Sequence, residues 1–448
     1  MRTKYLLIFL LITCSSCKKF LGTKSNQILS TPGNLEDLQL LLDNPTLQNG
    51  LNSINTGTDE YYVTYQNWSN LTEVNKNGYN WDPQLNNRGD WSTTYQCVFY
   101  ANTVLFNLDQ IPEKGDAVKR NNIKGAALFI RAHYFYLIAQ EFAPQYDPAT
   151  ATTDLGIVLR LDADFNEISS RSTVAQTYQQ ITSDLEAAAA LLTEERPLFK
   201  TRPGKAACLA LLARVYLQMG NYTKAKEHAD ACLKMANSLV DYNNLPLTAP
   251  YPMGDFNKNI EILYLFNASF ATPLNGDETR GRTDSVLYKL FKADDVRKKA
   301  LFKDNGNGTY TFKGSYTGTK TLFNGLAVDE VYLIRAECYA RMNNAVSALE
   351  DLNALLQKRW ATNKYVNYQN LPADQVLQLV LEERRKELLN RGTRWSDLRR
   401  LNKEPKFAIT LKRELNGQIY ELAPNDLRYT VLIPLEIMRL TDLPQNPR

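Results

Sequence analysis

Histidine and cysteine are scarce in this chain. Of its 448 residues, two are histidine (His133 and His228) and six are cysteine. A Ser/His/Asp triad or a histidine-based zinc site would need one of these histidines, and neither lies in a recognisable catalytic motif. Beyond residue 17 the sequence has no CxxC pair, and its four remaining cysteines lie in apolar patterns typical of small core residues. The sequence therefore has no recognisable histidine-based catalytic or zinc site, and we expect no cofactor.

A strong excess of either charge is also missing. The chain has 52 Lys and Arg against 48 Asp and Glu, a formal net charge of +4 and a pI of about 8.5. Such a mild and evenly mixed balance argues against nucleic acid as a partner. Hydrophobic residues make up 44% of the chain, which is enough for a sizeable core in a globular protein.

An apolar run near the N-terminus, from Tyr5 to Ile12, is far shorter than the roughly 20 residues of a membrane-spanning helix. It follows two basic residues and ends in the small pair Ser15-Ser16 before Cys17. This layout predicts a bacterial lipoprotein signal at residues 1–16 and a lipidated Cys17. Cys14 is a competing acceptor, since it also ends an apolar stretch, and an ordinary cleaved signal is a further alternative.

The rest of the sequence is dominated by helical periodicity. Residues 17–31 are polar and predict a lipidated tether, and residues 32–448 predict a single domain. Thr173 and Gln176 have capping-box spacing at the start of one helix. Apolar residues spaced by three and four predict helix pairs over about 91–142, 173–236 and 329–391.

Two segments, 205–236 and 329–360, alternate small and large residues like tetratricopeptide units. The sequence thus predicts a mainly α fold, a tetratricopeptide-like helical-repeat scaffold. Loop-rich insertions at about 51–90 and 238–328 interrupt it, the second with a predicted hairpin between 310–312 and 321–323. Because loops on a rigid scaffold usually carry binding, these insertions are the predicted ligand-binding region.

Four sequence features, in order along the chain, carry a family resemblance. They are Lys18-Lys19-Phe20-Leu21 after Cys17, the aromatic-rich segment 131–137 (RAHYFYL), the helices from Thr173 through 212–217 (LARVYL), and 382–388 (EERRKEL) followed by 394–400 (RWSDLRR) and 445–447 (QNP). Together they resemble the SusD/RagB family of outer-membrane nutrient-binding lipoproteins across nearly the whole chain. Arg391, where many members have an acidic residue, and the terminal Arg448 depart from the family pattern.

The resemblance implies a lipid-anchored protein at the cell outer membrane, exposed at the cell surface. It would bind a nutrient, an oligosaccharide or a peptide, and deliver it to a SusC-like TonB-dependent transporter without chemistry. Cys17 would hold it on the membrane beside that partner. The alternative is a tetratricopeptide-type scaffold that binds a peptide or protein at the outer membrane, in which case the loop aromatics would be core residues.

The candidate ligand-binding residues lie in a polar, turn-rich segment of the first insertion. Tyr79 and Trp81 could stack on the apolar face of a sugar. The neighbouring polar candidates for sugar hydroxyls are Asn80, Asp82, Asn87 and Arg88. Trp68 is a further aromatic candidate, and burial of Trp81 beneath the loop is the alternative. The second insertion adds Tyr251, Phe256, Phe270, Tyr288, Tyr310 and Tyr316.

Two other motifs have structural interpretations. The segment 381–400 (LEERRKELLNRGTRWSDLRR) predicts ion pairs along a helix surface rather than catalytic carboxylates, with Arg394 and Asp397 as a buried pair. Residues 304–309 (DNGNGT) match half of a calcium loop, but the twelfth position is Ser315 and not the glutamate that such a loop needs. We therefore expect a tight turn between two strands and no metal there.

Overall fold

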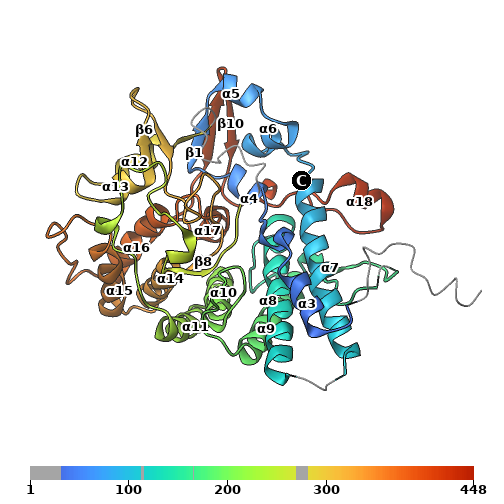
Figure 1. Ribbon diagram of the computed structural model, residues 1–448. Helices are drawn as coiled ribbons and strands as arrows, with labels where there is room; N and C mark the ends of the chain where they lie inside the picture. Colours follow the sequence, from blue (N-terminus) through green and yellow to red (C-terminus); the bar gives the residue numbers. More distant parts are fainter. Residues whose placement is uncertain (1–31, 113–115, 165, 269–280) are drawn as a thin grey trace, which may run out of the picture.

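The computed structural model describes residues 32–112, 116–164, 166–268 and 281–448. The predicted signal, the lipidated Cys17 and the tether lie outside these residues. The long helices follow one another as neighbours: α8 packs against α7 and α9, α9 against α10, α10 against α11, α11 against α14, and α14 against α15 and α16 (Figure 1). Their bounds are α3 Leu35–Leu42, α7 Arg88–Gln110, α8 Ala117–Phe142, α9 Val174–Leu191, α10 Lys205–Gln218, α11 Tyr222–Met235, α14 Val328–Arg341, α15 Ala345–Gln357, α16 Ala373–Glu387 and α17 Arg394–Leu401.

Polar side chains cap the starts of α3, α7, α8, α9, α11 and α15. Thr173 accepts a hydrogen bond from the Gln176 amide at 3.1 Å, and the Gln176 side chain accepts one from the Thr173 amide at 2.9 Å. This capping box begins α9, as predicted, and satisfies two backbone donors that the helix cannot pair itself. Asn34 caps α3 by a single bond, in which its side-chain oxygen accepts from the Asp37 amide at 2.9 Å.

Small residues let neighbouring helices approach closely at the centre of the scaffold. Ala206, Ala210 and Ala213 of α10 are buried, and α11 packs against them with Ala225 and Ala229. A side chain as small as alanine brings two backbones together and leaves room for large neighbours to interlock. The predicted mainly α, tetratricopeptide-like fold is confirmed.

The strands are short and pair in antiparallel twos. Their bounds and partners are β1 Tyr61–Val63 with β5 Gly281–Thr283, β2 Leu155–Val158 with β3 Arg171–Thr173, β4 Ile262–Tyr264 with β8 Leu326–Ala327, β6 Phe302–Asp304 with β7 Tyr310–Phe312, and β9 Leu411–Leu415 with β10 Gln418–Leu422.

The predicted hairpin partner of β7 was wrong. β7 pairs with β6, so that Asp304 lies opposite Tyr310, and not with residues 321–323. Gly306 and Gly308 adopt positive φ of 76° and 77°, a conformation that glycine enters without steric cost, and this closes a tight turn between the strands. The expected turn at 304–309 is confirmed. In the part of the chain that the structure describes, no group of three His, Cys, Asp or Glu side chains could hold a metal ion.

The two insertions lie together above the helical scaffold in Figure 1. The first contains α4 Ser53–Thr56, β1, α5 Tyr65–Ser69 and α6 Glu73–Tyr79, and the second contains β4 to β8, α12 Ser285–Leu290 and α13 Arg297–Leu301. They meet where β1 pairs with β5. The β9–β10 hairpin joins them from the C-terminal part of the chain, which ends after α18 Leu435–Leu440. We call this assembly the loop-rich layer.

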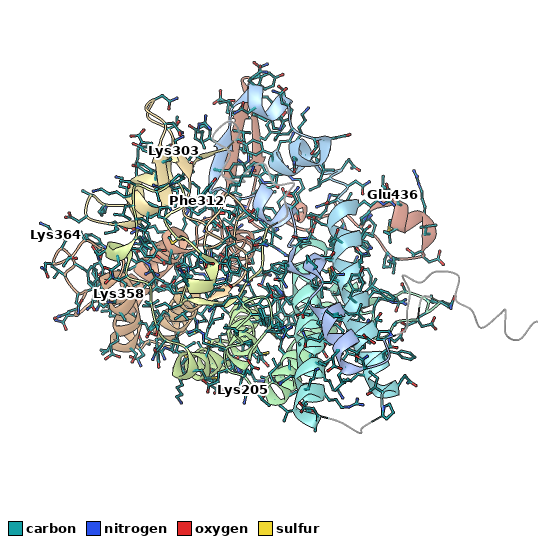
Figure 2. The ribbon with its side chains drawn as sticks, viewed as in Figure 1. Lys205, Lys303, Phe312, Lys358, Lys364 and Glu436 are labelled. Carbon is teal, nitrogen blue, oxygen red and sulfur yellow. The ribbon has the colours of Figure 1, made fainter. Side chains whose placement is uncertain are left out.

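The described residues were compared with the requirements of a membrane-spanning helix and of a disulfide. None of their helices is long and apolar enough to cross a membrane. Cys97, Cys208, Cys232 and Cys338 are buried free thiols, as expected of core residues. In Figure 2, Lys364 lies at the left edge of the molecule and Lys205 at its lower edge.

Candidate functional site

Arg413 of β9 organises the first insertion. Its guanidinium carbon lies 3.6 Å from the centroid of the Tyr79 ring, 4.9 Å from that of Trp81 and 5.1 Å from that of Tyr61. We call these four side chains the arginine box. A buried guanidinium is attracted to the faces of aromatic rings, so Arg413 draws the three rings together.

Hydrogen bonds fix the arginine box in place. Arg413 donates to the backbone oxygens of Thr58 at 2.6 Å and of Tyr61 at 3.0 Å. The Tyr79 hydroxyl accepts from the Val63 amide at 3.0 Å, and Trp81 Nε1 donates to the Gly57 oxygen at 2.9 Å. The box therefore ties the β9–β10 hairpin to β1 and to the chain around α6.

Tyr79 and Trp81 are consequently buried. The exposed fraction of Tyr79 is 2% and that of Trp81 is 4%. Their rings meet Arg413 and cannot stack on a sugar in this conformation, so the expectation of two open rings gives way to the alternative of burial. Sequence alone could not show this, because the cation that covers the rings lies more than 330 residues further along the chain.

Trp68 keeps a partly open ring. It stacks on Tyr65 of the same short helix, with ring centroids 5.9 Å apart and 27° between the planes. Tyr65 is 48% exposed and Trp68 is half-buried. Trp68 Nε1 donates to the Lys76 oxygen at 3.4 Å, and the Lys76 ammonium lies 5.7 Å from the ring centroid. We call this pair the α5 aromatic stack.

One of the predicted polar residues lies beside that stack. The Asn80 backbone N–H donates to the Lys76 oxygen at 3.1 Å, so Trp68 and Asn80 meet at one carbonyl at the end of α6. Asp82 is half-buried, and its carboxylate accepts from the Gln84 amide at 2.7 Å. The structure thus brings Trp68 and Asn80 together at the end of α6, and Asp82 follows two residues after Asn80.

Asn87 and Arg88 lie elsewhere. Asn87 is buried as the cap of α7 and donates to Asp90 at 2.6 Å and to Glu141 at 2.8 Å. Burial raises the pKa of Glu141 well above its usual value, and the neighbouring Asp90 raises it further. Asn87 therefore holds a pair of buried carboxyl groups and is out of reach of a ligand. Arg88 is exposed at the start of α7 and lies near Glu436 of α18.

The second insertion provides another aromatic stack. Tyr288 of α12 and Tyr310 of β7 are both half-buried, with ring centroids 3.6 Å apart and 12° between the planes. Tyr251 and Phe256 are also partly exposed, whereas Tyr316 is buried. Phe270 lies outside the described residues. Of these candidates, Tyr288 and Tyr310 form the second partly open pair of rings, here called the α12–β7 stack.

A buried ionic network joins the second insertion to the scaffold. Arg297 Nη2 lies 2.7 Å from both Asp295 Oδ2 and Glu383 Oε2, and its Nη1 lies 2.9 Å from Glu387 Oε2. Arg359 bridges Glu387 at 2.7 Å and Glu261 at 2.8 Å. We call these six residues the ionic network.

The predicted ion pairs along the surface of 381–400 are thereby corrected. Glu383 and Glu387 are buried and pair chiefly with arginines from distant segments, although Glu383 also pairs with Lys386 one turn away at 2.7 Å. Arg394 bridges Asp59 of the first insertion at 2.6 Å and not Asp397. Helical spacing places charges on one face, but it cannot tell whether another segment covers that face.

Asp397 instead bridges Arg384 and Arg400, both at 2.8 Å. Burial alone would raise the pKa of Asp397, but these two guanidinium groups hold that pKa at about 2. The segment therefore joins parts of the protein interior, and its buried carboxylates, Glu383, Glu387 and Asp397, are occupied by structural partners.

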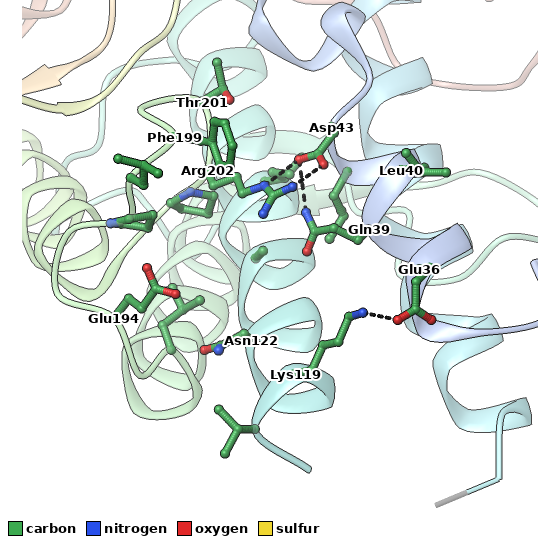
Figure 3. Close-up of a pocket in the computed structure, with 18 of the residues that line it drawn as sticks. Glu36, Gln39, Leu40, Asp43, Lys119, Asn122, Glu194, Phe199, Thr201 and Arg202 are labelled. Carbon is green, nitrogen blue, oxygen red and sulfur yellow. Dashed lines mark hydrogen bonds and ion pairs between the residues drawn. The ribbon is translucent and has the colours of Figure 1, made fainter. Parts of the chain in front are cut away.

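The sequence analysis did not predict a groove on the scaffold. This groove, about 640 Å³ in volume, lies between α3, α8 and the α9–α10 connection (Figure 3). Its rim includes the exposed Leu198 and Phe199. A cluster of exposed apolar residues in a connecting loop was the available clue, but only the fold shows what lies opposite it.

Comparison with known proteins gives this architecture a family. Residues 19–217 match a family model described as "Starch-binding associating with outer membrane", and residues 328–431 match the SusD family model. The chain is 24% identical over 424 residues to SusD-like protein P2 of Formosa agariphila, covering 80% of this chain and 79% of that protein.

Solved structures agree with the fold. A putative sugar binding protein from Bacteroides vulgatus has a TM-score of 0.76 at 22% identity, covering 93% of this chain and 99% of that one. A SusD superfamily protein from Bacteroides thetaiotaomicron has a TM-score of 0.75 at 23% identity, covering 93% and 100%. A laminarin binding SusD-like protein has a TM-score of 0.67 at 17% identity, with the same coverage. The chain belongs to the SusD/RagB family.

Proposed function

We propose that this protein is a cell-surface lipoprotein that binds an oligosaccharide on its loop-rich layer and delivers it to a SusC-like TonB-dependent transporter in the outer membrane. The observation that carries the proposal is the α5 aromatic stack, a partly open pair of rings that meets Asn80 at the Lys76 carbonyl, in a chain of this family. Flat rings suit the apolar face of a sugar, and the polar side chains suit its hydroxyl groups.

Each part of the proposed site has a distinct role. Tyr65 and Trp68 form the platform, Asn80 and Asp82 bind hydroxyl groups, and the α12–β7 stack offers a second pair of partly open rings on the same layer. Tyr79 and Trp81 act beneath it, as walls of the arginine box that hold α6 in position. Binding of this kind involves no bond making or breaking, so the protein releases its ligand unchanged.

Lipidation of Cys17 completes the proposal. The several acyl chains of a bacterial lipoprotein hold a protein firmly on a membrane, whereas one chain holds it only marginally. A binding protein tethered beside its transporter meets it at high effective concentration, so weak binding of each ligand is sufficient.

A scaffold that binds a peptide or protein through its helical repeats is the second candidate. The burial of Tyr79 and Trp81 favours it, since a scaffold needs no open aromatics in its loops. Affinity purification of the tagged full-length lipoprotein from solubilised outer membranes separates the two. The proposal expects a barrel of the TonB-dependent class in stoichiometric yield, and its absence beside another bound protein would favour the scaffold.

A further inference from the structure

We infer that the groove between α3, α8 and the α9–α10 connection is the surface on which the transporter docks, through a short apolar segment that carries lysine or arginine. We call it the α3–α8 groove. Ile130 and Leu192 are among the apolar residues of its lining, and Val118, Leu198 and Phe199 contribute exposed apolar surface. The inference rests on the proposed function, because it names the surface that would meet the proposed partner.

Ion pairs hold the groove walls in place. Arg202 of the α9–α10 connection makes a two-pronged contact with Asp43 at the end of α3, at 2.6 and 2.9 Å (Figure 3). At the other end Lys119 of α8 pairs with Glu36 of α3. A groove whose walls are already fixed loses little conformational freedom when a partner enters, so more of the contact energy goes into affinity.

The rim exposes large apolar side chains to water. Leu198 is 85% exposed and Phe199 is 57% exposed, although both are residue types that usually lie inside proteins. Arg202 lies over the Phe199 ring, with its guanidinium carbon 4.9 Å from the centroid, so the ring has a fixed position. An exposed apolar surface with polar residues around it is typical of a protein interaction site.

The charge of the groove favours a protein partner over the membrane surface. The groove lining carries four carboxylates (Glu36, Asp43, Asp116 and Glu194) and two cations (Lys119 and Arg202). Both cations are paired, and Glu194 has no ion pair in the part of the chain that the structure describes. An acidic surface is repelled by anionic lipid head groups and attracts a protein segment that carries lysine or arginine.

The position of the groove in the chain fits a partner in the same membrane. Helix α3 begins at Leu35, eighteen residues after the predicted lipidated Cys17, and Glu36 lies in the groove. At roughly 3.3 to 3.6 Å per extended residue, that segment keeps α3 within about 60 Å of the lipid. The groove would therefore lie within reach of the extracellular loops of an outer-membrane barrel.

The test compares the yield of transporter per tagged lipoprotein in affinity purification from solubilised outer membranes. The double substitution Leu198→Glu with Phe199→Glu adds charge to the apolar rim, and Glu194→Lys reverses the unpaired acid. Val366→Glu is the matched control: it is 83% exposed, and Lys364, two residues before it, lies at the edge of the molecule far from α3 (Figures 1 and 2).

We expect at least a tenfold lower transporter yield for the double variant, a lower yield for Glu194→Lys, and wild-type yield for Val366→Glu, with melting temperatures of all purified variants unchanged. Wild-type yield for both groove variants would overturn the inference while leaving the proposed function intact. Cross-linking of Lys119 to a second copy of this chain, and not to the barrel, would also overturn it. Absence of any barrel with the wild-type protein would overturn the proposed function itself.

Discussion

At the scale of single residues, Arg413 explains why the most promising aromatics of the sequence are not open to a ligand. Its guanidinium makes cation–π contacts with three rings and donates hydrogen bonds to the backbone oxygens of Thr58 and Tyr61. Tyrosine and tryptophan in a polar, turn-rich segment suggest a binding surface, but they serve equally well as the walls of a cation site. Which of these two roles the rings take depends on Arg413, a residue on the distant strand β9.

Replacing Arg413 with Ala should destabilise the protein strongly. The variant loses a buried cation–π contact and leaves buried carbonyls unpaired, a combined cost of about 3 kcal/mol. The free energy of unfolding in urea measures it. Lys412→Ala is the control: Lys412 is the preceding residue on β9, and it forms an exposed ion pair with Glu421 that should contribute less than about 1 kcal/mol. Equal effects of the two substitutions would show that the box adds nothing to stability.

The buried carboxyl group of Glu141 should make the free energy of unfolding depend on pH. It is fully buried, and its pKa is raised well above its usual value, so the folded protein holds a proton there that the unfolded chain releases near pH 4.5. Between these two values, this residue lowers the free energy of unfolding by about 1.4 kcal/mol for each unit of rising pH. Glu141→Gln keeps an acceptor for Asn87 and cannot ionise, so its stability relative to wild type should increase as the pH rises.

Urea unfolding at pH 5.5, 7 and 8.5 checks this prediction. Glu350→Gln, a substitution of an exposed carboxylate on α15, is the control and should leave the pH dependence of wild type unchanged. If Glu141→Gln were equally destabilising at all three pH values, the carboxyl group would not be protonated in the folded protein.

At the scale of elements, the ionic network shows how a loop-rich insertion is kept in a fixed position on a helical scaffold. Glu261, Asp295 and Arg297 come from the second insertion, Arg359 follows α15, and Glu383 and Glu387 come from α16. Buried charges need partners with good geometry, so the network specifies one arrangement of these segments. Such rigidity is what a binding surface built from loops requires.

Arg297→Ala should therefore destabilise the protein by about 3 to 5 kcal/mol, because it leaves Asp295, Glu383 and Glu387 buried without their common partner. Chemical denaturation measures the loss, with the exposed Lys364→Ala as the control. Arg297→Met, which fills a similar volume without charge, should not rescue stability, since three buried carboxylates would then share only Lys386 and Arg359 as cationic partners. Recovery of stability with Met would mean that packing, and not charge, explains the role of Arg297.

At the scale of the whole molecule, helical periodicity and caps predicted the scaffold well. The capping box at Thr173 and Gln176 begins α9, and the alanine-rich α10 and α11 pack as tetratricopeptide-like neighbours. These signals are local, since a helix and its cap are encoded within a few residues. The family motifs, which lie along the whole chain, indicated the same architecture.

Contacts between distant segments could not be read from the sequence. The hairpin partner of β7, the partner of Arg394 and the cover over Trp81 each depend on which segments the fold brings together. Of the predicted ligand-binding residues, Trp68 and Asn80 come together, because both contact the Lys76 carbonyl of α6. Asn87 and Arg88 follow closely in sequence but lie at the start of α7, where Asn87 pairs with the buried Asp90 and Glu141 and Arg88 lies near Glu436.

The most direct test of the central claim is calorimetric titration of the soluble chain from Lys18 onward with the oligosaccharide it prefers on a glycan array. The account predicts saturable binding, recovery of the oligosaccharide intact by mass spectrometry, and at least a tenfold weaker affinity for Tyr65→Ala with Trp68→Ala at unchanged melting temperature. Binding of peptides and no glycan, or undiminished glycan affinity in that double variant, would contradict it.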